Sequence, residues 1–192
     1  MPDPKQELHL KLQTSRAAIV SKLDGLSEYD MRRPMTATGT NLLGLVKHLA
    51  GIEYGYLGDA FGRPAPEPIA WIDDGSIWDG ADMWVRSEES SDYIRGLYLR
   101  ACAHGDQTID ELDLDAPGSV AHWPEYRRST SLGVLLIRMV DEAARHAGHA
   151  DIIRELVDGG AGPDHDSFGD EAAWHAHVAA IQGAADTFRT DT

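Results

Sequence analysis

The sequence predicts an all-α protein: a four-helix bundle with a long crossover connection between its second and third helices. Three observations support this prediction. Four long segments repeat apolar residues at steps of three and four, which is typical of amphipathic helices. No segment alternates apolar and polar residues over the length of a strand. Two long irregular segments separate the helices, so helices that follow each other in sequence need not be antiparallel.

The first helix is expected over residues 5–23, with Gly25 as the residue that ends it. Residues 27–39 form a connection. Thr40 or Asn41 then caps the second helix, because both side chains accept hydrogen bonds from the free amides of a first turn. This helix is expected over NLLGLVKHLAGIEYGYLGDAFG, residues 41–62, and the sequence changes character from Gly58 on. The apolar stripes of the two helices comprise Leu8, Leu12, Ile19 and Leu23 in the first, and Leu42, Leu45, Leu49, Ile52 and Tyr56 in the second.

Residues 58–86 are rich in proline and glycine, so they form a connection rather than a helix or strand. This connection is long enough to travel the length of a bundle, so the helices that it joins can be parallel neighbours. Its apolar anchors are expected to be Trp71, Trp78 and Trp84. The third helix is expected over residues 87–112, with Ser87 as its cap. Its stripe comprises Ile94, Leu97, Tyr98, Ala101, Thr108 and Ile109, with Cys102 beside it as a partly buried thiol rather than a nucleophile.

Residues 113–130 form a second long connection. Its residues His122, Trp123, Glu125, Arg127 and Arg128 are expected to be surface residues with one packed tryptophan, and the alternative is that they border a pocket. The fourth helix follows, with Ser129 or Ser131 as its cap and Gly159 and Gly160 at its end. Its expected buried stripe comprises Leu132, Leu135, Met139, Glu142, His146, His149, Ile153 and Leu156. Residues 1–192 are expected to form one domain with a core over about 5–160, and residues 161–192 a tail with a short helix over 172–188.

Composition excludes several classes of protein. The 17 basic and 32 acidic residues give a net charge of -15, which disfavours binding to nucleic acid or to an anionic membrane. No apolar run approaches the ~18 residues that span a bilayer, and the first residues lack the order of a signal peptide. The single cysteine, Cys102, excludes an intramolecular disulfide and fits a reducing cytoplasm. The expected partners are therefore small molecules or a second copy of the chain.

The polar middle of the fourth helix is the candidate site. An ionised carboxylate on an apolar face needs a partner or a metal. Glu142 and His146 are four residues apart, so both can reach one ion, and His48 on the stripe of the second helix adds a third donor. Three such ligands with open positions are typical of a catalytic zinc site, and nickel, cobalt or iron suit the same donors. The alternative is a hydrogen-bonded core network of Glu142 with the histidines. His149 is a fourth ligand, a group that supports a ligand, or a general base.

The sequence resembles the DinB-like superfamily of four-helix metalloproteins over nearly its full length. Within it, the sequence is similar to an actinobacterial branch of unknown function, related to mycothiol-dependent maleylpyruvate isomerase and mycothiol S-transferases. The segment GTNLLGLVKHLAGIEYGYLGDAFGRP resembles the second helix of that branch and contains the first ligand position, His48. The segment DEAARHAGHADIIREL resembles the signature of the last helix, with Glu142 where histidine is usual, His146 as the next ligand, and His149 in place of a glutamine.

The resemblance implies a metal-dependent S-transferase that uses a low-molecular-weight thiol such as mycothiol. His48, Glu142 and His146 would bind zinc or, as an alternative, nickel. The thiol would bind the open metal position as a thiolate and attack an electrophilic substrate, while His149 moves a proton or orients the thiol. An anionic or sugar-bearing thiol also needs a binding surface, for which Arg127, Arg138 and Arg145 are the candidates. The alternatives are a non-catalytic metal-binding or stress-related bundle, a dimerising scaffold, and a metal-dependent hydrolase.

Overall fold

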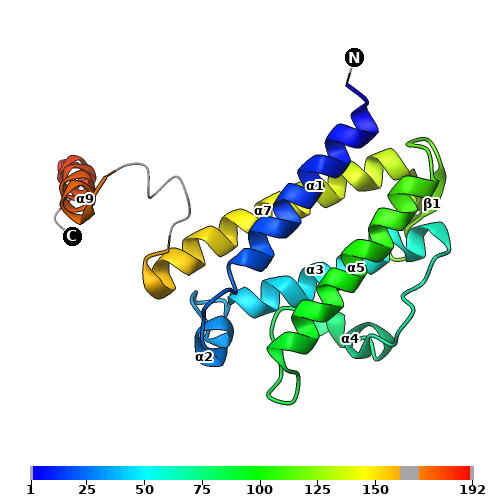
Figure 1. The fold of residues 1–192 in the computed structure, drawn as a ribbon, viewed down its shortest axis with the longest axis horizontal. Coiled ribbons are helices and arrows are strands. Elements are labelled where there is room, and N and C mark those ends of the chain that lie inside the picture. The colour runs from blue at the N-terminus through cyan, green and yellow to red at the C-terminus, as the bar shows by residue number, and fades with distance from the viewer. Residues whose placement is uncertain (1, 161–168, 191–192) are drawn as a thin grey trace.

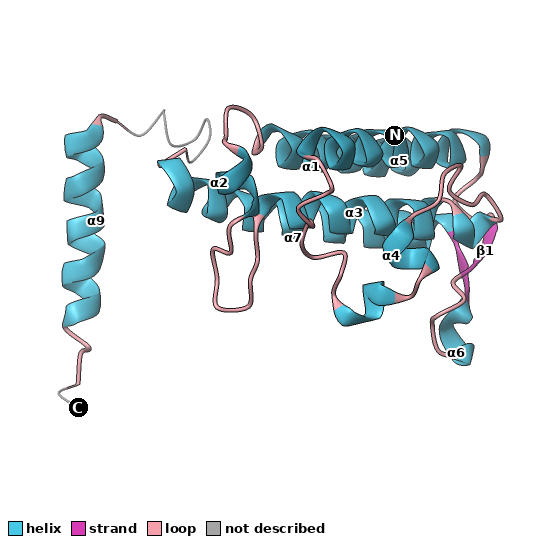
Figure 2. Ribbon diagram, turned by 90° about the horizontal axis from the view of Figure 1, so that it is seen from below, coloured by secondary structure: helices cyan, strands magenta, loops and turns pink. Residues whose placement is uncertain are grey.

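The computed structural model describes residues 2–160 and 169–190. Four long helices form the bundle: α1 (Pro4–Ser21), α3 (Leu42–Leu57), α5 (Ser91–Glu111) and α7 (Leu132–Asp158) (Figure 1). Helix α3 packs against α5 and α7, and α1 packs mainly against α7. Figure 2 shows α1 and α5 above α3 and α7, with α4 and α6 on the far side of that second layer. The predicted all-α four-helix bundle is confirmed.

Local capping explains where the helices begin and end. The side chain of Asn41 accepts the amide of Gly44 at 2.8 Å, as expected for the cap of α3. Gly159 ends α7 with a φ of 78°, a conformation that favours glycine. Helix α5 begins four residues later than expected, because the cap is Ser90 and not Ser87; its hydroxyl accepts the amide of Tyr93.

The first long connection lies on the bundle and contains three short helices, η1 (Asp59–Phe61), α4 (Ala70–Asp73) and η2 (Ser76–Asp79). Lys47 of α3 holds it in place. The Lys47 side chain is 1% exposed, donates to the Trp84 carbonyl at 3.1 Å and the Glu89 carboxylate at 2.8 Å, and lies over the Trp71 ring. Trp71 is buried as expected. The expectation was wrong for Trp78 and Trp84, which are 73% and 51% exposed. At Trp84 the contact with Lys47 is made by the backbone carbonyl, so the ring is left at the surface.

The crossover makes α3 and α5 parallel neighbours, as its length predicted (Figure 1). Lys47 in the first half of α3 contacts Glu89 just before α5, whereas Tyr54 near the end of α3 packs against His104 in the second half of α5. The second connection holds β1 (Pro117–Ser119), which pairs antiparallel with β2 (Ser129–Ser131), and α6 (Glu125–Arg128) between them. These short elements, and α2 (Glu28–Arg32), are too brief to give a periodic pattern.

The buried face of α7 differs from the expected stripe in its middle and at its end. Its buried residues are Leu132, Leu135, Leu136, Met139, Ala143, Ala147, Ala150 and Ile153. The centre of this face is formed by Ala143, Ala147 and Ala150. These alanines directly follow Glu142, His146 and His149, so the buried face is rotated by about 100° from the expected stripe. Glu142 and His146 therefore lie at its edge, while His149 and Leu156 are exposed, contrary to expectation.

The tail helix α9 (Glu171–Asp186) matches the expected helix closely. It contains no buried residue, and its apolar residues Val178 and Ile181 are both 57% exposed. The start of the predicted tail, including Pro163, lies outside the described residues. Within the described part of the chain, no helix has the length and apolar character needed to cross a membrane.

Candidate metal centre

The structure brings His48 of α3 together with Glu142 and His146 of α7. Each offers one ligand atom, and these three atoms lie within 4.8 Å of one another. We call these three residues the metal group. Nε2 of His146 is 3.6 Å from a Glu142 carboxylate oxygen, close to the ~3.4 Å between two ligands placed tetrahedrally at ~2.1 Å from zinc. The side chains are only 12–21% exposed. The donor set and its spacing therefore fit a divalent metal ion.

Asp82 fixes the orientation of the His48 ring. Its carboxylate lies 2.6 Å from Nδ1 of His48 and is itself 7% exposed. A carboxylate accepts hydrogen bonds, so Nδ1 carries the proton and Nε2 keeps its lone pair for a metal. Such a carboxylate–histidine pair is common beside protein-bound zinc. Asp82 is not predicted from the sequence, because it lies in the irregular connection of residues 58–86, where no periodicity indicates which acidic residue turns inward.

His146 stays neutral near pH 7. Burial, and then the positive charges of His48, His149 and Arg145, lower its pKa to about 4. A neutral imidazole can bind a metal ion without first losing a proton. Nδ1 of His149 lies 3.3 Å from Nδ1 of His146, on the side away from Glu142. His149 is exposed and is not a member of the metal group, so its position is that of a residue that contacts a ligand.

Arg138 holds the third member of the group. Its Nη2 donates to Glu142 at 3.1 Å, and its guanidinium lies 4.8 Å from the centre of the Tyr56 ring. The other two candidate arginines lie elsewhere: Arg127 packs on Trp123, and Arg145 pairs with Asp141 on the exposed face of α7. Of the three arginines considered from the sequence, Arg138 is the one that lines the cavity beside the metal group.

A cavity of about 360 Å³ opens beside the metal group, a volume within the usual range of small-molecule sites. Both long connections border it. Trp78 comes from the first connection and His122 from the second, and their rings meet edge to face at 5.6 Å. Burial, and then the charge of Arg138, lower the pKa of His122. The lining residues are His48, Gly51, Ile52, Gly55, Tyr56, Asp59, Ile72, Ile77, Trp78, Asp82, His122, Arg138 and Glu142.

The fold and this arrangement define a class: a helical-bundle protein with a candidate metal centre beside a ligand-sized cavity. The family model of mycothiol-S-transferases matches residues 7–159, so the chain belongs to that family. Among solved structures, the crystal structure of a conserved protein from Enterococcus faecalis resembles this fold with a TM-score of 0.62. The two are 15% identical, and the match covers 83% of this chain and 99% of that chain. No protein of curated function matches the chain.

Proposed function

We propose that this protein is a metal-dependent S-transferase that joins mycothiol to an electrophilic small molecule. His48, Glu142 and His146 would hold a divalent ion, with zinc as the first choice and nickel as the second. The observation that supports this proposal is the position of the metal group: His48 and Glu142 also line the cavity, on a chain of the mycothiol-S-transferase family. A ligand in the cavity therefore has direct access to two of the three donors.

A divalent ion bound here would lower the pKa of a thiol ligand, which supplies a thiolate near neutral pH. The residues of the chain keep the site ready for this chemistry. Asp82 and Arg138 orient His48 and Glu142, so that little rearrangement is needed when a metal binds. The thiol proton must leave the site, and we assign its transfer toward solvent to His149, which is exposed and contacts His146.

The electrophile would occupy the part of the cavity lined by Ile52, Ile77 and Trp78. A new bond forms between sulfur and the electrophilic carbon, and the electron pair displaced from that carbon leaves with a leaving group or moves into a neighbouring atom of the substrate. Arg138 lines the same cavity, and its positive charge can stabilise such developing negative charge. We place the reaction in the cytoplasm, where low-molecular-weight thiols are kept reduced.

The first test is the metal content of the purified protein, prepared without added metal or chelator. We expect one ion per chain in the wild type and loss of the ion in His146→Ala. His175→Ala is the matched control, because His175 lies on α9 and is exposed. Mycothiol consumption with a model electrophile is then measured with both variants. If the wild type neither contains nor takes up zinc or nickel, the proposal fails, and the three residues form a hydrogen-bonded network instead.

A further inference from the structure

A second cavity, also of about 360 Å³, adjoins the one beside the metal group. Asp59 and Ile72 line both cavities and so form the boundary between them. We infer that this second cavity binds the uncharged, hydroxyl-rich sugar arm of the thiol co-substrate, while the sulfur end lies at the metal group. This inference rests on the proposed function and adds a binding site for the part of the co-substrate that does not react.

An unpartnered hydroxyl is the first observation that points to a ligand. Tyr54 of α3 lines the second cavity and is 1% exposed, yet its hydroxyl has no hydrogen-bond partner in the chain. A buried polar group without a partner is costly. Burial raises the pKa of Tyr54, and the nearby Glu67 carboxylate adds to this effect. The hydroxyl therefore stays protonated, and its hydrogen-bonding capacity is available to a ligand that reaches it.

The charge of the second cavity determines what kind of ligand it suits. Among the described residues, its lining includes three carboxylates and no basic side chain. Two of the carboxylates already have partners: Glu67 binds Arg100 through both oxygens, at 2.7 and 3.0 Å, and Asp73 accepts the Ile69 amide. Asp59 is the third, and burial raises its pKa. An anionic ligand would be repelled here, whereas sugar hydroxyls can donate to these oxygens.

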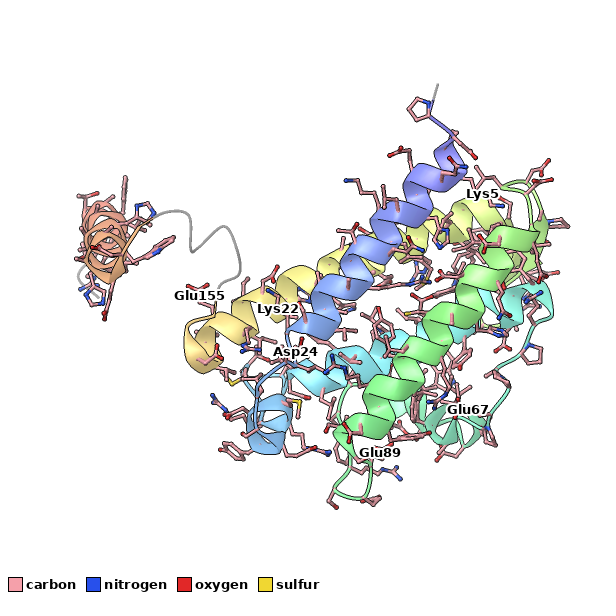
Figure 3. The ribbon with its side chains drawn as sticks, in the orientation of Figure 1. Lys5, Lys22, Asp24, Glu67, Glu89 and Glu155 are labelled. Atoms are coloured by element: carbon pink, nitrogen blue, oxygen red, sulfur yellow. The ribbon has the colours of Figure 1, made fainter. Side chains whose placement is uncertain are left out.

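The walls complete a site suited to a sugar. Prolines 64, 66 and 68 alternate along one side, and Ile69 and Ile72 add apolar surface on which the carbon-bound faces of a sugar ring can pack. Proline fixes the backbone φ, so this wall is ordered before a ligand arrives. Glu67 lies in the same segment, next to α5 (Figure 3), and its pairing with Arg100 of α5 ties the wall to the bundle.

A continuous path joins the two cavities along α3. His48, Ile52, Gly55 and Asp59 follow steps of three and four, and all four line the first cavity. From His48 to the end of α3 at Leu57 this path is about 14 Å long, at 1.5 Å per residue. Gly55 lies in its middle, and a Cβ added there would meet no atom within 4 Å. An extended ligand can therefore pass over Gly55 from the metal group to the second cavity.

The first experiment tests the second cavity without the metal. The N-acetylated sugar arm of mycothiol, lacking the cysteine, is titrated by calorimetry into metal-free protein. We expect binding, and a loss of about 2- to 10-fold in affinity for both Tyr54→Phe and Asp59→Asn, which is the effect of one hydrogen bond. Tyr29→Phe, at an exposed position of α2, is the control and should leave the affinity unchanged. Thermal unfolding should show Tyr54→Phe as stable as the wild type, because that hydroxyl has no partner in the chain.

The second experiment blocks the path. Gly55→Leu places a side chain over the middle of the path, and Gly55→Ala adds only a methyl group and is the matched control. We expect Gly55→Leu to retain its metal and to raise the KM for mycothiol about tenfold, with the KM for N-acetylcysteine unchanged. Failure of the sugar arm to bind the wild type, or an equal effect of Gly55→Leu on both thiols, would overturn the inference. Absence of metal and of thiol turnover, with the sugar arm still bound, would instead overturn the proposed function.

Discussion

Two polar clusters lie inside this bundle, and they are built on opposite principles. The first, which we call the Arg16 cluster, comprises Arg16 of α1, Glu53 of α3, and Asp106 and His9 beside them. Arg16 donates twice to Glu53, at 2.7 and 2.6 Å, and once to Asp106 at 2.5 Å. The metal group brings together two imidazoles and a carboxylate, and Arg138 contacts Glu142 through the carboxylate oxygen other than the one nearest His146.

The charges and contacts of the two clusters indicate which one is structural. In the Arg16 cluster a cation meets two anions, and the side chains of Arg16 and Glu53 are 6% and 0% exposed. Burial alone would lower the pKa of Arg16, but the charge and hydrogen bonds of Glu53 raise it instead. In the metal group the donors converge on one another, and their outer atoms are held by Asp82, His149 and Arg138. A site that is complete needs no ligand, whereas one whose donors converge is suited to bind a cation.

The two clusters should differ most in how much a single substitution in each one lowers the free energy of unfolding. Glu53→Gln leaves the buried Arg16 guanidinium without its main counter-charge, so we expect a loss of about 3–5 kcal/mol in the free energy of unfolding. Glu142→Gln, the matched change in the metal group, should cost less than about 1 kcal/mol in metal-free protein, because its partner Arg138 is 38% exposed. Urea unfolding at pH 7 measures both values. Equal losses for the two variants would contradict the distinction.

The next effect is on the pH dependence of stability in metal-free protein. The pKa of His146 is about 4 when folded, against an ordinary value of 6.5. Between pH 6.5 and pH 4 the unfolded chain binds a proton at this histidine and the folded chain does not. The free energy of unfolding therefore falls as the pH falls through this range. The full shift corresponds to about 3 kcal/mol. His146→Asn should remove this part of the acid sensitivity, and His175→Asn should retain it. Urea unfolding at several pH values between 7 and 4 makes the comparison, and identical slopes for wild type and His146→Asn would contradict it.

A smaller effect is expected on metal affinity when the support of His48 is weakened. Asp82→Asn keeps the size of the side chain but removes its charge, so we expect zinc to bind about 10- to 100-fold more weakly. Asp79→Asn, three residues earlier at an exposed position, is the control. Competition with a chromophoric chelator measures both affinities. An unchanged affinity in Asp82→Asn would show that His48 does not depend on this hydrogen bond.

These comparisons also show which features can be predicted from a sequence. The four helices and the pairing of Glu142 with His146 depend on local spacing, so periodicity was enough to find them. His48 lies beside that pair in the structure, and in the sequence its apolar stripe and a family resemblance group it with them. The rotation of α7 was not predicted, because the small side chains of the three buried alanines give a weak apolar signal and Ala144 in the same segment is exposed. His149 was therefore expected on the buried face and is exposed.

Features that depend on contacts between distant segments left no pattern to read. Asp82 reaches His48 across 34 residues of sequence, and it does so only because Lys47 and Trp71 hold the first connection on α3. The pairing of Arg16 with Glu53 spans 37 residues. Arg16 lies on the stripe of its helix between Leu12 and Ile19, which indicates that it is buried but not which residue it pairs with. The second cavity is bordered by a proline-rich segment, which the sequence identifies only as a connection. In each case the residue types were visible, but their partners were not.

The smallest expected effect on metal affinity concerns His149, and its measurement distinguishes three roles of this residue. His149 contacts His146 from an exposed position, where water can replace the lost hydrogen bond. His149→Ala should therefore weaken zinc binding by only about 2- to 5-fold, less than Asp82→Asn. If His149 moves the thiol proton, mycothiol turnover at saturating zinc should fall further than the metal affinity does, and its pH profile should change. Loss of the ion in His149→Ala, as expected for His146→Ala, would instead show that His149 is a ligand. Equal small losses in metal affinity and in turnover would show that His149 only positions His146.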